Sequence, residues 1–351
     1  MTSQNQEKRK IKIALDAMGG DFAPLNEVQG VFDAFKNNMT GCDIEVVLVG
    51  DDAKIRAAVT KYIDKKYSDN VSVEHADQVI TMDDEPTAGL KSKKNSSLTK
   101  GVELLKNGYV DAFVSAGNTG AVMSTSTILN GRIKGVSRPT IGTFIPTLKK
   151  SPTLLLDVGA NAECKPKFLY EFAVMGSIYA THMFGLENPG VGLLNIGEEP
   201  GKGTETVQQA YKLLKASQLN FIGNIEGRDI LPGTADVVVC DGFTGNVILK
   251  FAESVIGFLK NKMKEFASRN AFNMAAVAMI APIFRRIFKG MDYQEHGGVP
   301  LLGVNGVVII GHGKSTPKAI QNMIFKAVET VKKDVNGKIE KALNPPVISK
   351  I

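Results

Sequence analysis

At least five short apolar segments of the sequence end in glycine, aspartate or asparagine and then lead into a helical pattern. They are residues 11–16, 112–114, 153–157, 191–195 and 236–240. Strands that alternate with helices of ten or more residues favour a mainly parallel, doubly wound sheet with helices on both faces. Ligands of such sheets bind beyond the carboxyl ends of the strands. The pattern therefore predicts a doubly wound α/β fold with a cleft lined by polar strand ends.

The segment 111–126, with the sequence DAFVSAGNTGAVMSTS, combines a buried strand, a turn carrying Gly117 and Gly120, and a helix that opens near Thr119. Such a turn directs backbone N–H groups and the positive end of a helix at one point, which suits an anion. Ser115 and Asn118 add small side-chain donors. The same residues are also common as turn and cap residues in any α/β protein, so both interpretations stay open.

Four other strand ends carry similar polar groups. Gly19 and Gly20 form a turn after Asp16, and Asp157 and Asn161 follow the strand at 153–157. Asn195 precedes the segment IGEEPGKGTE, which contains Glu198 and Lys202, and the segment DGFTGN contains Asp241, Gly242, Thr244 and Asn246. Lys202 is either an anion ligand or a solvent-exposed lysine, and Asp241 either acts in catalysis or only caps a helix. His312, in a glycine-rich turn, either acts as an acid or anion ligand or has only a structural role.

Residues 82–101 change from acidic to basic along the chain. A solvated loop is the simplest interpretation. The alternative is a lid that brings Lys93 and Lys94 to a phosphate, with Ser96 capping the helix that follows.

Several motif classes are absent from the sequence. The glycine that a P-loop requires five residues before Gly313 is replaced by Val308, and no GxGxxG follows the first strand, which argues against a kinase and a standard dinucleotide-binding dehydrogenase. Cys42, Cys164 and Cys240 are scattered and indicate small core or loop residues. No cysteine or histidine cluster suggests a metal, and we expect none.

The charge balance favours acidic partners. Lys and Arg outnumber Asp and Glu by 42 to 36, which gives a net charge of +6. Tryptophan is absent and aromatic residues make up 7%, so nucleic acid is the weakest candidate partner. The polar N-terminus predicts no secretory signal, and the longest apolar run, 274–281, is too short to span a membrane. We therefore expect a cytoplasmic protein with a disordered tail at 1–10, one domain at 11–335 and a flexible tail at 336–351.

Residues 247–290 predict a protruding pair of amphipathic helices, because large apolar residues recur at helical spacing beside lysines and arginines. Such a stripe is typical of a core or a dimer interface, and also of a helix that lies at a membrane surface. The candidate membrane contacts are Phe272, Met274, Val277, Met279 and Ile280.

Six motifs carry a family resemblance: DAMGGD, KKNSS, SAGNTGA, LLLDVGAN, LLNIGEE and DGFTGN. In this order they closely resemble the bacterial phosphate acyltransferases of phospholipid synthesis. The resemblance implies a three-layer α/β/α fold akin to isocitrate and isopropylmalate dehydrogenases and to phosphotransacetylase. It also implies a homodimer and peripheral attachment to the inner face of the cell membrane. It implies acyl carrier protein and inorganic phosphate as partners and no cofactor. The acyl phosphate product would pass to a glycerol-3-phosphate acyltransferase that uses it.

The residues fit this chemistry. Phosphate is already a nucleophile at neutral pH, so the enzyme must bind it, remove its water and align it with a thioester. The candidate catalytic residues are Lys202, Asp241, Asn246 and His312. The candidate substrate-binding residues are Asp16, Gly19, Gly20, Lys94, Ser115, Gly117, Asn118, Thr119, Gly120, Asp157, Asn161, Asn195, Glu198, Gly242 and Thr244. The competing hypotheses are a non-catalytic membrane-associated scaffold that binds the acyl carrier and a dehydrogenase of the related fold.

Overall fold

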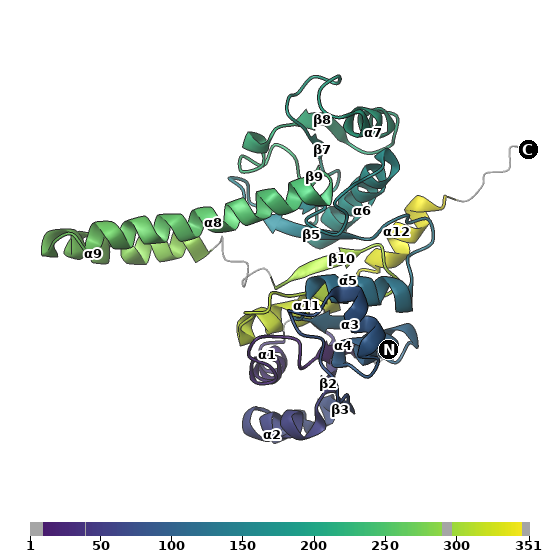
Figure 1. Ribbon diagram of the computed structural model, residues 1–351, viewed down its shortest axis with the longest axis vertical. Coiled ribbons are helices and arrows are strands. Elements are labelled where there is room, and N and C mark those ends of the chain that lie inside the picture. The colour runs from purple at the N-terminus through teal and green to yellow at the C-terminus, as the bar shows by residue number, and fades with distance from the viewer. Residues whose placement is uncertain (1–9, 39, 290–296, 346–351) are drawn as a thin grey trace, which may run out of the picture. The chain divides into compact units, whose positions relative to one another are not determined.

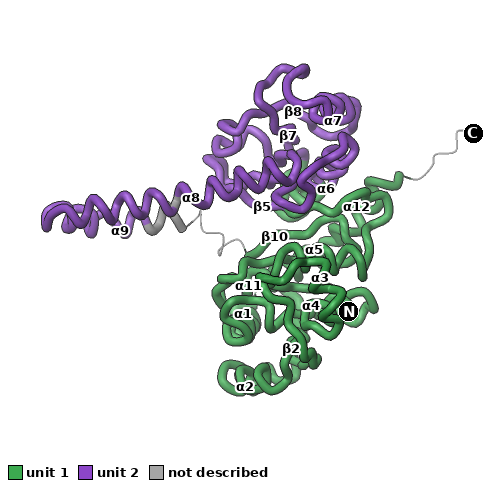
Figure 2. The backbone as a smooth tube through the Cα atoms, in the orientation of Figure 1, with its two compact units in different colours: residues 1–141, 178–187, 296–351 green, residues 142–177, 188–295 purple. Residues whose placement is uncertain are grey.

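The computed structural model describes residues 10–38, 40–289 and 297–345. Within it the chain divides into two compact units, drawn in different colours in Figure 2. Unit 1 comprises residues 1–141, 178–187 and 296–351, and unit 2 comprises residues 142–177 and 188–295. The sequence predicts one domain at 11–335 and does not indicate this division. Strand β5 (Thr140–Ile145) and helix α6 (Pro166–Phe184) each contribute residues to both units.

The sheet of unit 1 has the strand order β3-β2-β1-β4-β11-β10. These strands are β1 (Lys10–Asp16), β2 (Asp43–Gly50), β3 (Val71–His75), β4 (Ala112–Ser115), β10 (Val299–Leu302) and β11 (Val307–Ile310). All neighbours are parallel except β10, which runs antiparallel to β11. Ser115 is in register with both Asp16 and Ile310. Three polar turns therefore begin at the same level of this sheet.

The sheet of unit 2 has the order β5-β6-β9-β7-β8. Strands β6 (Thr153–Leu156), β7 (Val191–Leu194), β8 (Phe221–Ile225) and β9 (Val237–Val239) are parallel to one another, and β5 is antiparallel to β6. Leu156 and Leu193 are both in register with Val239. The predicted mainly parallel α/β class is confirmed.

Helices cover both faces of the unit 1 sheet. On one face α1 (Leu25–Lys36), α2 (Asp52–Tyr62) and α11 (Pro317–Lys332) enclose a core with β1, β2, β4 and β11. Helix α11 buries Ile320, Met323, Ile324, Ala327 and Val328, the spacing of an amphipathic helix. On the other face lie α3 (Pro86–Ser92), α4 (Ser97–Lys106) and α5 (Thr119–Thr125), where Phe113 of β4 packs against Gly101 of α4.

Unit 2 contains α7 (Glu205–Lys215) and a long helical pair, α8 (Gly242–Ala267) and α9 (Ala271–Lys289). The pair lies side by side and extends away from the unit 2 sheet, as the sequence predicts (Figure 1). Helix α8 begins at Gly242 rather than near 247, because the Asp241 side chain accepts from the backbone N–H of Thr244 and caps it. Among the described residues, α8 is the one helix whose length and composition would allow it to cross a membrane. Charged residues interrupt the apolar stretch of α8, so the longest unbroken apolar run in the sequence does not indicate this helix.

Two predictions about local structure are wrong. The expected flexible tail at 336–351 is helical over α12 (Val335–Leu343), because Val335 and Ile339 are buried against unit 1. The expected loop at 82–101 contains α3, capped by Glu85, and the start of α4, whose predicted cap at Ser96 is confirmed. The tail residues 1–9 and 346–351 lie outside the described residues.

The contact between α1 and α11 gives a test of this packing. A Cβ added at Gly30 would lie 2.5 Å from the Cβ of Ile320 and 2.8 Å from the carbonyl oxygen of Pro317. Gly30→Ala should therefore lower the free energy of unfolding by about 1–3 kcal/mol, measured by thermal or urea unfolding. The control is Gly257→Ala in α8, where a Cβ meets no atom within 4 Å; it should leave stability unchanged or raise it by up to about 1 kcal/mol. Equal effects of the two substitutions would contradict this packing.

Candidate active site

In unit 1 the polar strand ends meet around the buried carboxylate of Asp16. Its Oδ2 accepts from the Ser115 hydroxyl at 2.8 Å, and its Oδ1 accepts from the backbone N–H of Met18 at 3.1 Å. Burial raises the pKa of Asp16, and the nearby hydroxyls of Ser97 and Ser115 with the N–H groups of Met18 and Gly19 oppose the rise. The Ser97 hydroxyl has no hydrogen bond of ordinary geometry to any described residue. Asp16 thus fixes the backbone of the turn that follows β1 through its hydrogen bonds.

The turns after β1 and β4 cross over this carboxylate. A Cβ at Gly19 would lie 2.5 Å from Asp16 Oδ2 and 2.9 Å from the backbone nitrogen of Gly117. The Gly117 N–H donates to Ser115 Oγ at 3.0 Å. These two glycines are therefore required by the close approach of the two turns, whether or not a ligand lies against them.

A buried acid that no sequence motif marks lies next to Gly20. Glu27, in the first turn of α1, is 1% exposed, and its Oε1 occupies the space where a side chain at Gly20 would begin. Its Oε2 has no hydrogen-bond partner among the described residues. Burial, reinforced by the charges of Asp16 and Asp21, raises the pKa of Glu27 to about 8. Glu27 is therefore largely protonated at neutral pH.

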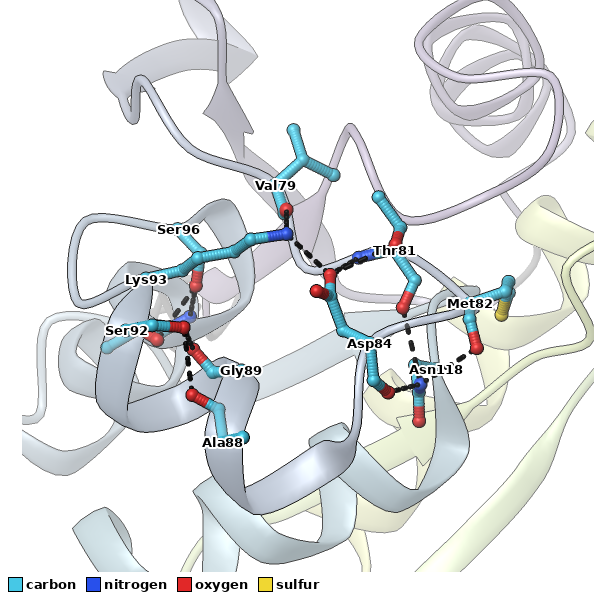
Figure 3. A network of polar contacts seen from close by, with 11 residues as sticks. Val79, Thr81, Met82, Asp84, Ala88, Gly89, Ser92, Lys93, Ser96 and Asn118 are labelled. Carbon is cyan, nitrogen blue, oxygen red and sulfur yellow. Dashed lines mark hydrogen bonds and ion pairs between the residues drawn. The ribbon is translucent and has the colours of Figure 1, made fainter.

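Asn118 fastens the segment before α3 to the start of α5, as Figure 3 shows. Its Nδ2 donates to the carbonyl oxygens of Thr81, Met82 and Asp84 at 3.1–3.3 Å, and its Oδ1 caps α5 at the N–H of Ala121. Its amide is therefore engaged with the protein. Gly120 also packs closely against the protein, because a Cβ there would lie 2.7 Å from Pro86 Cγ. Thr119 is exposed at the first position of α5.

The two lysines of the predicted lid have different environments. Lys93 Nζ donates to the carbonyl oxygen of Val79 at 2.9 Å and forms an ion pair with Asp84 at 2.5 Å (Figure 3). The Lys93 ammonium, together with the N–H of Thr81, lowers the pKa of Asp84 to about 2. Lys93 thus stabilises its own segment, whereas Lys94 is exposed and has no polar partner among the described residues.

His312 follows β11 at the same level as Ser115. The backbone N–H of Gly311 donates to the Ser115 carbonyl oxygen at 2.8 Å, and that of Asp21 donates to the carbonyl oxygen of Gly313 at 2.8 Å. The exposed His312 ring accepts at Nδ1 from the N–H of Lys314 at 3.1 Å. A neutral His312 therefore carries its proton on Nε2.

In unit 2 the buried carboxylate of Asp157 organises the turn after β6. Its Oδ1 accepts from the N–H of Ala160 at 3.2 Å, and its Oδ2 accepts from the backbone and side-chain nitrogens of Asn161 at 2.7 and 2.8 Å. The Gly242 N–H donates to the carbonyl oxygen of Asn161 at 2.7 Å. A Cβ at Gly242 would lie 2.9 Å from Asp157 Oδ2. These predicted ligand residues form one hydrogen-bonded scaffold.

Asp241 and Asn246 lie at the start of α8, beside this scaffold. Both carboxylate oxygens of Asp241 accept from Thr244, one from its N–H and one from its hydroxyl, each at 2.8 Å. Asn246 is exposed next to Gly159 and has no hydrogen-bond partner among the described residues. Asn246 is therefore the better placed of the two to contact a substrate.

Lys202 lies in the turn between β7 and α7. It is exposed, and its ammonium has no ion pair or hydrogen bond with any described residue. The Asn195 side chain donates to the Lys202 carbonyl oxygen at 3.0 Å and accepts from the N–H of Ile196 at 2.8 Å. Glu198 lies 3.7 Å from Arg228 in an exposed ion pair. Of these predicted site residues, Lys202 alone presents an uncommitted charge.

The thiols are not suited to nucleophilic chemistry. Burial raises the pKa of Cys164 to about 12 and that of Cys240 well above its ordinary value, with further contributions from Asp157 and Asp241. Neither residue forms appreciable thiolate at neutral pH. Cys42 is buried in unit 1. No group of three or more His, Cys, Asp or Glu in the described part of the chain could hold a metal ion.

Comparison with known proteins identifies the family. A family model described as "Fatty acid synthesis protein" matches residues 11–338. Phosphate acyltransferases of Dictyoglomus turgidum and Nitratiruptor sp. are 46% and 47% identical to this chain, over 95% of its length and 98% of theirs. The chain belongs to the phosphate acyltransferase family. It is accordingly an acyltransferase.

Solved structures support the fold assignment. A phosphotransacetylase from Streptococcus pyogenes superimposes with a TM-score of 0.60 at 18% identity, covering 92% of this chain and 94% of its own. The EutD phosphotransacetylase from Staphylococcus aureus gives a TM-score of 0.58 at 19% identity with the same coverage. The predicted relation to phosphotransacetylase is thereby confirmed at the level of fold.

The buried position of Glu27 gives a test by pH. Because its folded-state pKa of about 8 lies above its ordinary value of 4.5, the stability that its protonated form contributes is fully present below pH 4.5. That stability is lost as the pH rises through about 8. Glu27→Gln cannot ionise and therefore does not lose this stability. The unfolding free energy of the variant minus that of the native protein should rise by at least about 1 kcal/mol between pH 5 and 8.5, measured by urea unfolding. Exposed Glu103→Gln in α4 is the control, and a Glu27→Gln difference independent of pH would contradict the assignment.

Proposed function

We propose that this protein transfers a fatty acyl group from acyl-(acyl carrier protein) to inorganic phosphate. The acyl phosphate would then serve the first acylation of glycerol 3-phosphate in phospholipid synthesis. The observation that carries the proposal is the match over 95% of the chain to relatives named phosphate acyltransferase. The uncommitted ammonium of Lys202 at the end of the unit 2 sheet fits a phosphate ligand.

The reaction is a direct displacement. A phosphate oxygen attacks the thioester carbonyl, the carbonyl oxygen takes up negative charge, and the carbon–sulfur bond then breaks to release the carrier thiolate. Lys202 holds the phosphate, and the side-chain amide of Asn246 donates to the developing oxyanion. A thiolate is a weakly basic leaving group, so the protein need supply little general acid catalysis.

The sequence indicates two candidate donors for the proton on the departing thiol, Asp241 and His312. Asp241 accepts two hydrogen bonds from Thr244 and is engaged as a helix cap. His312 carries a proton on Nε2 when neutral, because its Nδ1 accepts from Lys314. A neutral imidazole does not give up this proton to a thiolate. We therefore propose that the departing thiolate takes its proton from water.

The anion-binding role of the glycine turns in unit 1 receives less support. The N–H of Gly117 already donates to Ser115, and Asn118 donates to three carbonyl oxygens. We therefore propose Lys202 as the main phosphate ligand.

The helical pair would attach the protein to the inner face of the cell membrane. Phe272 and Met279 of α9 are 82% and 78% exposed, and Met274 and Ile280 are also exposed. Side chains of this size at a surface gain free energy when they enter a lipid interface. The apolar stripe of α8, which includes Phe251 and Phe258, would pack against a second copy in a homodimer.

The activity test uses the purified full-length protein with acyl-(acyl carrier protein), with and without inorganic phosphate. We expect phosphate-dependent release of the carrier thiol and an equal amount of acyl phosphate, trapped by hydroxylamine as the hydroxamate. Lys202→Met should lower the rate at least tenfold, about 1.4 kcal/mol, while Lys212→Met at an exposed position of α7 should not. Thiol release that is absent or indifferent to phosphate would contradict the transferase and favour the scaffold hypothesis.

Membrane attachment is tested by flotation with vesicles of anionic phospholipid. Phe272→Asp combined with Met279→Asp should abolish co-flotation and leave the soluble acyl transfer rate within about twofold, because charged groups are costly in the interface. Leu148→Asp, at an 88% exposed position elsewhere in unit 2, is the control and should float like the native protein. Unchanged flotation of the double variant would rule out this contact.

A further inference from the structure

Side-chain amides hold the backbone around Lys202. The carbonyl oxygens of Gly201 and Gly203 both accept from Gln208 Nε2, at 2.8 and 3.2 Å. The carbonyl oxygen of Lys202 itself accepts from Asn195 Nδ2 at 3.0 Å. Three consecutive peptide groups are thus fixed by amide side chains.

A third amide fixes the start of the same turn. Asn224 Nδ2 donates to the carbonyl oxygen of Glu199 at 2.9 Å, and the N–H of Lys202 donates to that oxygen at 3.1 Å. Gly203 has a φ of +84°, and a Cβ there would collide with the Asn195 side chain. The turn therefore has one well-defined backbone path.

The three amides come from three different elements. Asn195 directly follows β7, Asn224 lies in β8, and Gln208 lies in the second turn of α7. Exposed glycine-rich turns otherwise sample many conformations, at a cost of roughly 1–2 kcal/mol per residue when they are ordered. A flexible lysine side chain binds an anion more effectively when its backbone is already ordered.

We propose that Gln208, together with Asn195 and Asn224, is a positioning residue that holds the Lys202 turn so that the ammonium meets phosphate. Asn195 then acts through Lys202 and does not itself contact substrate. The inference rests on the proposed function, in which Lys202 binds phosphate. Nothing in the sequence marks Gln208, because glutamine is common on exposed helices.

The test compares Gln208→Met with Gln209→Met. Methionine keeps the length of the side chain and removes both donors. Gln209 is the adjacent residue of α7, and its side chain donates to exposed Glu205. We expect Gln208→Met to raise the KM for phosphate by about five- to tenfold with kcat within about threefold, because misplacement weakens phosphate binding. Gln209→Met should change neither constant by more than about twofold.

A double-mutant cycle with Lys202→Met separates positioning from general structure. If Gln208 acts through Lys202, its substitution should change the KM for phosphate by less than about twofold once Lys202 is methionine. An equal effect in both backgrounds, or an effect no larger than that of Gln209→Met, would overturn the inference. A Lys202→Met enzyme of native activity would instead overturn the proposed role of Lys202. If Gln208→Met does not fold by circular dichroism, Gln208→Glu, which presents carboxylate oxygens to the same carbonyls, gives the same test.

Discussion

Two buried carboxylates hold the strand ends of this protein, one in each unit. Asp16 ends β1 and accepts from the turn that follows it, and Asp157 does the same after β6. A buried carboxylate must be hydrogen-bonded, so each one fixes the N–H groups of its turn. Each also excludes a side chain from a neighbouring glycine, Gly19 in unit 1 and Gly242 in unit 2. The polar turns of the two sheets depend on this arrangement.

Because scaffold residues occupy so many donors, few groups are left to act on a substrate. Asn118, Asp241 and Asn195 are residue types that commonly bind ligands. Here, however, the side chain of each is hydrogen-bonded to backbone groups of the protein. Lys202 and Asn246 are exposed and have no polar partner among the described residues. Phosphate supplies its own nucleophilic oxygen, so a protein that orders one cation and one amide donor has the main requirements for the transfer.

The sequence predicts the sheet because apolar strands and amphipathic helices have distinct periods. It also predicts which turns are polar. It does not show how their side chains are used: the partners of Asn118 are carbonyl oxygens more than 30 residues away. Glu27 has the sequence context of an ordinary first-turn glutamate, and its burial depends on tertiary packing against Gly20. Helix α12 is missed for the same reason, since only Val335 and Ile339 are buried in it.

The direct attack of phosphate on the thioester can be tested by intact-protein mass measured in a single turnover. The purified enzyme, in excess over acyl-(acyl carrier protein) and without phosphate, should release no thiol and gain no acyl mass. Addition of phosphate should then release one thiol for each acyl phosphate formed. A burst of thiol before phosphate is added, with an acyl group on the protein, would show a covalent intermediate and contradict the mechanism.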